Sequence, residues 1–228
     1  SGEKSFYDPL KDFKSNGYNT IKLLKYATEI KCRQFIFMSS ALVYGDKQAA
    51  NLSEKSSTSP KNFYGMSKEL SEKYIQKYKD KGLNYTILRL FSVYGSTQRL
   101  DTINQGMIRI YLTQLSKKKS LIVKGSGDRF RDFIHVNDVV EYVKIIINNK
   151  KFFNQILNIG SGKKTTIKSL LKLIKKKIKF DFKVKYISGT IDDKFGFAAN
   201  INKLKRMSKV SPKVSLDSGV GEMIKKYF

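Results

Sequence analysis

Hydrophobic and polar positions along the chain switch repeatedly between a helical spacing and the short apolar runs of buried strands. The helical spacing predicts a long helix over residues 8–30 and a second helix over residues 63–81, between Ser59-Pro60 and Gly82. The candidate core contacts of the first helix are Leu10, Phe13, Ile21, Leu24 and Ala27. Continuous apolar runs at residues 33–39 and 85–91 predict strands that are buried on both faces.

The second half of the chain continues this alternation. Helices are predicted over residues 104–115 and 138–148, and short strands over residues 121–123 and 156–159. One apolar helix stripe is formed by Ile167, Leu170, Leu171, Ile174 and Ile178. The lysine-rich opposite face of that helix favours an outer helix packed on a core, and a helix lying on a membrane surface is the alternative. The alternation predicts an α/β fold with a parallel sheet.

The 228 residues are 40% hydrophobic, which is enough to bury a core and argues against a disordered chain. No apolar run approaches the ~18 residues that span a bilayer, and no basic-then-apolar leader opens the chain. The single cysteine, Cys32, cannot form an internal disulfide, so we expect a small buried thiol in a reducing cytoplasm. No clustering of histidine, cysteine and acidic residues predicts a metal site.

A formal net charge of +26 is the most unusual bulk property of the chain. The excess is nearly all lysine, spread over many segments, and the few arginines are scattered. We therefore interpret the charge as compositional and expect no nucleic-acid partner, with a polyanion-binding protein as the alternative. A strong positive field also attracts an anionic nucleotide sugar.

Tyr64 and Lys68 are the first candidates for catalysis. They stand four residues apart on a predicted helix and therefore share one face. A phenol ionises only near pH ~10, but a neighbouring cation favours the phenolate, and such a pair can exchange a proton with a sugar hydroxyl. An isolated tyrosine–lysine pair is common on solvated helices. Neighbouring segments are therefore needed to decide whether this pair is catalytic.

Ser39 and Ser40 provide that context, since they lie at the end of the strand predicted over residues 33–39. Active sites of open parallel sheets lie at the carboxyl ends of the strands. A hydroxyl at this position reaches the same substrate oxygen as Tyr64. Taken alone, Ser40 reads equally well as a cap of the next turn.

Four segments occur together in a fixed order: Ser-Ser-Ala-Leu-Val-Tyr-Gly at 39–45, Tyr-Gly-Met-Ser-Lys at 64–68, Leu-Arg-Leu-Phe-Ser-Val-Tyr-Gly at 88–95 and Arg-Phe-Arg-Asp-Phe-Ile-His-Val at 129–136. In these segments the chain resembles the extended short-chain dehydrogenase/reductase family, most closely its UDP-hexose 4-epimerase branch. The resemblance runs from Ser5 almost to the C-terminus. It implies a Rossmann-type parallel sheet flanked by helices, with a smaller C-terminal substrate-binding lobe.

The resemblance also implies a division of the chain and a pathway. Residues 1–97 and about 120–157 would form a partial NAD-binding domain, and about 98–119 and 158–228 the substrate lobe. It implies a homodimer formed through the helices near 8–30 and 63–81. The biological role that the resemblance implies is in carbohydrate metabolism, in the supply of sugars for polysaccharides.

The resemblance assigns roles to individual residues. Tyr64 would be the catalytic acid/base, Lys68 would lower its pKa and hold the nicotinamide ribose, and Ser40 would orient the sugar hydroxyl. The implied cofactor-binding residues are Asn16, Ser39, Tyr64, Lys68 and Phe91. The implied substrate-binding residues are Ser40, Ser92, Gln105, Val123, Lys124 and Arg131, with Arg131 clamping the diphosphate. The single histidine, His135, would support the Arg131 loop, with Asn137 and Asp138 capping the following helix.

The implied reaction is 4-epimerisation through transient oxidation at C4 of the sugar by NAD. Ala41 and Leu42 stand where dehydratases and decarboxylases of the family usually carry an acidic residue, and neither moves a proton. This favours epimerisation, with a 4-keto-sugar reductase as the first alternative and a non-catalytic ligand binder as the second.

One family feature is missing from the sequence. The family begins with a strand and a Gly-x-x-Gly-x-x-Gly turn that holds the dinucleotide pyrophosphate, and these residues contain no such turn. The resemblance therefore implies an N-terminally truncated family member. We expect the 228 residues alone to bind NAD weakly and to turn over little or no substrate, so that the truncated chain alone is inactive. We also expect an exposed apolar edge on the strand at 33–39.

Overall fold

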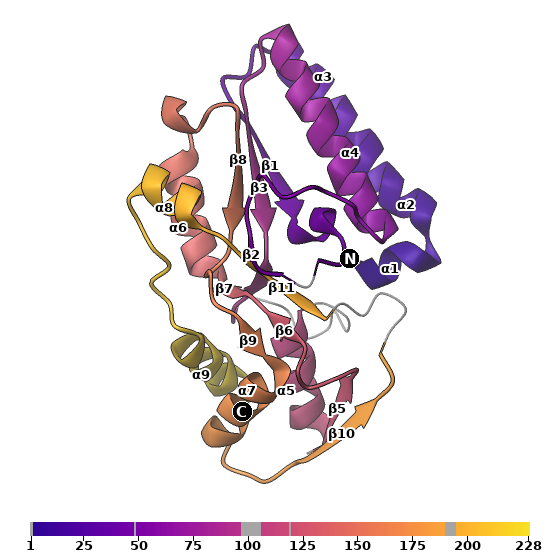
Figure 1. Cartoon of the computed structure of the whole chain (residues 1–228), viewed down its shortest axis with the longest axis vertical. Helices are drawn as coiled ribbons and strands as arrows, with labels where there is room; N and C mark the ends of the chain where they lie inside the picture. The colour runs from indigo at the N-terminus through magenta and orange to yellow at the C-terminus, as the bar shows by residue number, and fades with distance from the viewer. Residues whose placement is uncertain (1, 48, 97–105, 119, 190–194) are drawn as a thin grey trace.

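The computed structural model describes residues 2–47, 49–96, 106–118, 120–189 and 195–228. It is an α/β structure in which parallel strands are flanked by helices, which confirms the predicted fold class. Figure 1 shows two regions, one built around β1, β3 and β8 and one built around α5, α7 and α9.

The central sheet has three parallel strands in the order β1-β3-β8. These are β1 (Phe35–Ser40), β3 (Tyr85–Leu90) and β8 (Gln155–Ile159). The hydrophobic run of β3 is buried, as expected, but β1 lies at a sheet edge within the described residues, and Met38 is 39% exposed. The expectation that the strand at 33–39 is buried on both faces is therefore wrong for β1, because the face that carries Met38 is incompletely covered. The expected unpaired edge is present among the described strands.

The long helix predicted over residues 8–30 is divided. The chain forms α1 (Gly2–Tyr7), α2 (Pro9–Phe13), a π-helical turn η1 (Lys14–Tyr18) and α3 (Asn19–Glu29). The π turn changes the helical phase, so only part of the predicted stripe reaches the core. Leu24 and Ala27 are buried, whereas Leu10 is 80% exposed and Phe13 is 43% exposed, and the prediction of core contacts at these two positions is wrong.

Helix α4 (Phe63–Tyr78) packs with α3 against one side of the sheet and confirms the predicted helix, whose last turn is the 3₁₀ turn η3 (Lys79–Lys81). Its positive-φ Gly82 ends the helix as expected. Leu24, Ile75 and Ile87 are shared members of the core between these elements. On the other side lie α6 (Val136–Ile146) and α8 (Asn202–Ser208) (Figure 1).

The second region holds α5 (Met107–Lys118), α7 (Ile167–Lys177) and α9 (Leu216–Tyr227) beside the parallel strands β5 (Ser120–Lys124) and β10 (Lys183–Ile187). The α7 stripe is confirmed as a core face, since Ile167, Leu170 and Ile174 are fully buried. Leu121 and Val123 belong to this same core. The division into domains stays a prediction.

Short strands join the two regions and carry several site residues. A four-stranded sheet has the order β2-β11-β6-β9, from β2 (Ala49–Leu52), β11 (Gly196–Ala199), β6 (Phe130–Arg131) and β9 (Thr165–Thr166). A parallel pair is formed by β4 (Ser92–Tyr94) and β7 (Phe133–His135). The 3₁₀ turns η2 (Ala41–Tyr44) and η4 (Lys150–Phe152) complete the described elements.

The predicted capping of α6 by Asn137 and Asp138 is wrong. His135 itself is the N-cap, and its Nδ1 accepts a hydrogen bond from Asn137 N at 3.3 Å. Asp138 instead accepts from the backbone N–H groups of Lys213 and Val214, at 2.9 and 3.1 Å. Asp138 lies three residues beyond the cap position, in the first turn of α6, and its carboxylate reaches a neighbouring segment.

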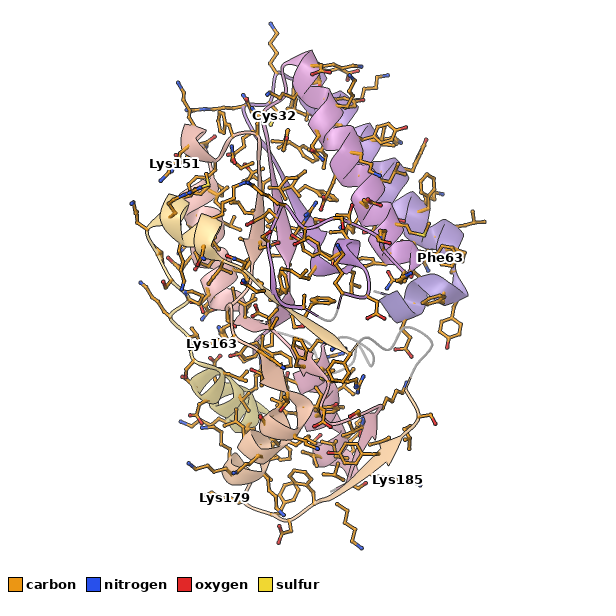
Figure 2. All side chains as sticks on the ribbon, in the orientation of Figure 1. Cys32, Phe63, Lys151, Lys163, Lys179 and Lys185 are labelled. Carbon is orange, nitrogen blue, oxygen red and sulfur yellow. The ribbon has the colours of Figure 1, made fainter. Side chains whose placement is uncertain are left out.

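Lysine side chains lie on widely separated parts of the surface, as the labelled Lys151, Lys163, Lys179 and Lys185 in Figure 2 show. This spread agrees with a compositional origin of the net charge. Among the described residues, no helix is long and apolar enough to cross a membrane.

Candidate active site

A cavity of about 440 Å³ lies at the carboxyl end of β1 and β3. Five of the predicted site residues line it: Ser40, Tyr64, Phe91, Ser92 and Arg131. Its other lining residues are Gly2, Ala41, Leu42, Leu90, Gly106 and Phe197. The cavity therefore gathers side chains from a strand end, the first turn of α4 and the strands β4, β6 and β11.

The first turn of α4 fixes the position of Tyr64. Asn62 is the N-cap, and its Oδ1 accepts from Gly65 N at 2.7 Å. Tyr64 N donates to the Ser5 hydroxyl at 3.1 Å, and this hydroxyl donates in turn to Gly2 O at 2.7 Å. The start of α4 is thus held by the segment α1 (Gly2–Tyr7), whose Phe6 ring meets the Phe63 ring edge-on at 5.8 Å. Sequence reasoning missed Ser5 and Gly2.

Gly65 allows α4 to approach the turn after Ser40. A Cβ at this position would lie 2.8 Å from Leu42 O and 2.9 Å from Pro60 Cβ. Both distances are shorter than real contacts, so any larger residue would push Tyr64 away from Ser40.

Gly65→Ala is therefore expected to destabilise the protein by about 1–3 kcal/mol, as overpacking does, even though alanine is the better helix former. Gly221→Ala is the matched control, because Gly221 lies inside α9 and an added Cβ meets nothing closer than 3.5 Å. That variant is expected to gain about 0.5–1 kcal/mol. Urea unfolding of the two variants checks the difference, and a Gly65→Ala protein as stable as Gly221→Ala would contradict the close approach.

Lys68 lies one helical turn after Tyr64 and points along the end of β1. Its Nζ donates to Met38 O at 3.0 Å and stands 4.6 Å from the centroid of the Phe37 ring and 5.7 Å from that of the Tyr64 ring. Burial lowers the pKa of Lys68, while the carboxylates of Asp12 and Glu72 act in the opposite direction.

The Tyr64 hydroxyl does not show the lowered pKa expected from Lys68. Burial raises the pKa of Tyr64, the negative charge of Asp12 raises it further, and a hydrogen bond from the Ser40 side chain opposes both effects. The expectation is wrong because desolvation of the phenolate dominates. Bound positive charge would be needed to favour the phenolate.

Ser40 and Ser39 serve different partners although they are adjacent. Ser40 Oγ accepts from Leu42 N at 3.2 Å, which caps η2, and Ser40 lines the cavity together with Tyr64. Ser39 is buried, and its hydroxyl donates to Glu72 Oε1 at 2.5 Å. The Ser39 hydroxyl is therefore bound to Glu72 of α4, and Ser39 does not line the cavity.

A buried ion pair stands behind the cavity, and sequence reasoning missed it. Arg89 from β3 donates to Glu72 of α4, with Nη2 at 2.7 Å from Oε2 and Nε at 3.1 Å from Oε1. The Arg89 guanidinium stacks 4.8 Å from the Tyr44 ring centroid, and Tyr44 donates to Asn158 Oδ1 at 2.6 Å. Although burial opposes the charge, the Glu72 carboxylate raises the pKa of Arg89 above its ordinary value. Glu72 lies four residues beyond Lys68, a spacing that was available in the sequence.

Asn16 lies in the π turn η1, which the helical pattern did not reveal. Its backbone oxygen accepts from Ser71 Oγ of α4 at 2.6 Å, and its side-chain amide donates to Asp12 Oδ1 at 3.2 Å. Single π turns inside helices often mark functional sites. The Asn16 side chain supports the site from behind rather than lining the cavity.

Arg131 enters the cavity from β6, and its Nη1 donates to Phe130 O at 2.7 Å. The neighbouring Asp132 is buried and accepts from Ser161 N, Ser161 Oγ, Gly162 N and Ala199 N at 2.6–3.0 Å. These bonds join β6, β8 and β11 next to Arg131. Phe197 of β11, which sequence reasoning missed, meets the Phe91 ring edge-on at 5.7 Å.

Two predicted substrate-binding residues, Val123 and Lys124, are not brought to the cavity. Val123 is fully buried in the core of the second region, and Lys124 pairs with Glu3 at 3.5 Å. Neither residue is part of the cavity wall. Gln105 lies outside the described residues.

Comparison with known proteins identifies the family. The family model of the NAD dependent epimerase/dehydratase family matches residues 1–160. A protein of Methanocaldococcus jannaschii provisionally named a UDP-glucose 4-epimerase is 30% identical over 223 residues, which are 96% of this chain and 71% of the relative. Other relatives are named dTDP-4-dehydro-6-deoxyglucose reductase and UDP-glucuronic acid decarboxylase. The chain spans 63% of the length of the UDP-glucuronic acid decarboxylase of Arabidopsis thaliana.

Solved structures agree with this assignment. The UDP-glucose 4-epimerase of Thermotoga maritima with UDP-glucose superposes with a TM-score of 0.93 at 27% identity, covering 100% of this chain and 74% of that one. The UDP-glucuronic acid 4-epimerase of Bacillus cereus, in complex with UDP-glucuronic acid and NAD, gives a TM-score of 0.85 at 26% identity, covering 93% and 67%. With its site segments, its sheet and these relatives, the chain belongs to the NAD dependent epimerase/dehydratase family.

Proposed function

We propose that the chain carries out 4-epimerisation of a nucleotide sugar, a UDP-hexose, by transient oxidation at C4 with NAD. The observation that supports this most directly is that Ser40 and Tyr64 line the same cavity at the carboxyl end of β1. A hydroxyl and a phenol in such a pair contact one substrate oxygen and move its proton.

Five residues that line the cavity have distinct roles in this proposal. Tyr64 takes the proton of the C4 hydroxyl and later returns it, and Ser40 orients that hydroxyl. Arg131 binds the diphosphate with its planar guanidinium. Ser92 contacts the sugar, and Phe91 flanks the nicotinamide.

The side chains present fit the nicotinamide end of NAD. The Lys68 ammonium has three N–H donors, and among the described residues only Met38 O accepts one of them, which leaves donors for the ribose hydroxyls. When bound, NAD would accept a hydride from C4 and return it. Because the Ser39 hydroxyl and the Asn16 amide are already engaged with Glu72 and Asp12, Lys68 and Tyr64 are the polar side chains we assign to the cofactor.

Ala41 and Leu42 favour epimerisation over dehydration or decarboxylation. Both line the cavity directly after Ser40, and neither has an ionisable group. The alternative activity is reduction of a nucleotide 4-keto sugar. It is supported by the similarity to the relative named dTDP-4-dehydro-6-deoxyglucose reductase.

The test uses the 228-residue chain with saturating added NAD, because these residues hold no Gly-x-x-Gly-x-x-Gly turn and we expect weak retention of the cofactor. Proton NMR should then detect slow interconversion of UDP-glucose and UDP-galactose. Consumption of NADPH with a 4-keto sugar, without C4 inversion, would establish the reductase instead. No conversion in either assay would refute both activities for this chain.

We also propose that two copies pair through α2, α3 and α4. Large apolar side chains are exposed on this side: Leu10, Phe13, Tyr18, Leu23, Tyr26, Phe63, Met66 and Tyr74. Contact with a second copy would bury them. Light scattering of the purified chain checks this, and a monomer at micromolar concentration would contradict it.

A further inference from the structure

The buried carboxylate of Asp132 has no role in the proposed mechanism, although Asp132 directly follows Arg131. Asp132 is 1% exposed. Its Oδ1 accepts from Ser161 N at 2.7 Å and from Ser161 Oγ at 2.6 Å, and its Oδ2 accepts from Gly162 N and Ala199 N, both at 3.0 Å. All four partners are donors, so both oxygens act as acceptors, which is the role of an ionised carboxylate.

These bonds fasten two other segments to the end of β6. Ser161 and Gly162 lie in the turn that follows β8, and Ala199 is the last residue of β11. The turn passes so close to the carboxylate that a Cβ at Gly160 would lie 2.6 Å from Asp132 Oδ2. Both the space around the carboxylate and its hydrogen bonds are therefore fixed by the surrounding backbone.

Three residues of the cavity wall are placed around Asp132. Arg131 precedes it in the chain, and Phe197 is the direct partner of Arg131 where β6 and β11 pair. Ser92 N of β4 donates to Asp132 O at 2.9 Å. All three line the cavity, each from a different strand. Asp132 thus lies where β4, β6 and β11 meet behind the cavity.

We propose that Asp132 is a positioning residue of the substrate side of the cavity: its carboxylate holds Arg131 and Phe197 at the spacing that binds a nucleoside diphosphate. Strand β6 is only 2 residues long, so strand pairing alone gives Arg131 little support. Bidentate binding of a phosphate by a guanidinium needs defined geometry, which supporting hydrogen bonds provide. The choice of a nucleoside diphosphate as ligand rests on the proposed function.

The test is Asp132→Asn, which keeps the shape of the side chain but replaces one acceptor oxygen by an NH2 donor. Whichever way the amide turns, this donor faces at least one backbone N–H, that of Ser161 or those of Gly162 and Ala199. UDP is titrated into the chain by calorimetry, without NAD. The dissociation constant should rise by at least about tenfold, the effect of losing one hydrogen bond to a charged group.

Asp138→Asn is the matched control. Asp138 is also buried, accepts from two backbone N–H groups, those of Lys213 and Val214, and does not line the cavity. It should lose stability in the same way but keep the UDP affinity of the natural chain. Unchanged affinity in Asp132→Asn, or an equal loss in Asp138→Asn, overturns the proposal.

Ser161→Ala keeps the test decisive if Asp132→Asn does not fold. It removes the hydroxyl bond to Asp132 and leaves the three N–H bonds in place. The dissociation constant of UDP should rise in the same direction by a smaller factor, about threefold. Natural affinity in this variant also overturns the proposal.

NMR separates this proposal from the proposed function, because it needs no ligand. The Arg131 Nε–H signal, assigned with Arg131→Lys, should become more mobile in 15N relaxation in Asp132→Asn and stay rigid in Asp138→Asn. A rigid Arg131 in Asp132→Asn overturns the proposal. If Arg131 becomes mobile but the natural chain does not bind UDP, the positioning role holds and the assigned ligand class fails.

Turnover gives a further readout that a general loss of structure would not produce. With saturating NAD, Asp132→Asn should raise KM for the UDP-hexose about tenfold and change kcat by less than about threefold. The reason is that Ser40 and Tyr64 come from β1 and α4, and none of the described hydrogen bonds of the Asp132 carboxylate reaches either element. A fall in kcat at unchanged KM would contradict a role on the substrate side.

Discussion

Tyr64→Phe is expected to lower C4 epimerisation by about 10²–10⁴-fold, the range that a positioned general acid/base contributes. The substitution removes only the hydroxyl of Tyr64, a residue that lines the cavity beside Ser40. The helix start is held by Asn62 and Ser5 through backbone groups, so the ring should stay where it is. The rate is measured by proton NMR with saturating NAD and UDP-hexose.

Tyr74→Phe is the matched control for this prediction. Tyr74 lies on the same helix, is exposed and does not line the cavity. It should leave the rate unchanged. If Tyr64→Phe also kept activity within about tenfold of the natural chain, a different group would have to carry the proton.

The largest expected effect on stability is that of Glu72→Ala. It leaves the buried Arg89 cation without its partner, and breaking a buried pair in this way costs about 3–5 kcal/mol. It also releases the Ser39 hydroxyl, which joins the end of β1 to α4. The free energy of unfolding, measured with urea, should fall by this amount.

The cause of that loss can be checked with the double variant Glu72→Leu/Arg89→Met. Removing both charges replaces a buried ion pair by apolar side chains, which is often neutral for stability. The double variant should therefore recover most of the loss, whereas a purely local cavity would make the two substitutions additive. Glu29→Ala, at an exposed pair, should change stability by less than about 1 kcal/mol.

The helical and strand patterns in the sequence predicted most elements of the fold, and the exceptions have a physical reason. The α7 stripe needs only local spacing to define its buried face, and it was predicted fully. Residues 8–30 have the same kind of spacing, but the π turn at Lys14–Tyr18 shifts the phase, so Leu10 and Phe13 face outward. A periodic pattern carries no sign of such an extra residue in a turn.

Some residues of the candidate site could be predicted from the sequence, and others could not. Ser40, Tyr64, Phe91, Ser92 and Arg131 sit in short ordered segments, and the structure gathers them at one cavity. Asp12, Ser5 and Phe197 come from segments without such a signature. Their relation to the site arises only when α1, α2 and β11 pack around it.

By itself the sequence determined the α/β class, the residue types available for proton transfer, and their placement at a strand end and on one helix face. Those features depend on the local spacing of residues, which can be seen in the amino-acid sequence. The tertiary structure alone decided the protonation of the site, because pKa values depend on burial and on charges that arrive from distant segments. The four-residue spacing of Tyr64 and Lys68 is visible in the sequence. Only the fold buries the phenol of Tyr64 and exposes both side chains to the negative charge of Asp12.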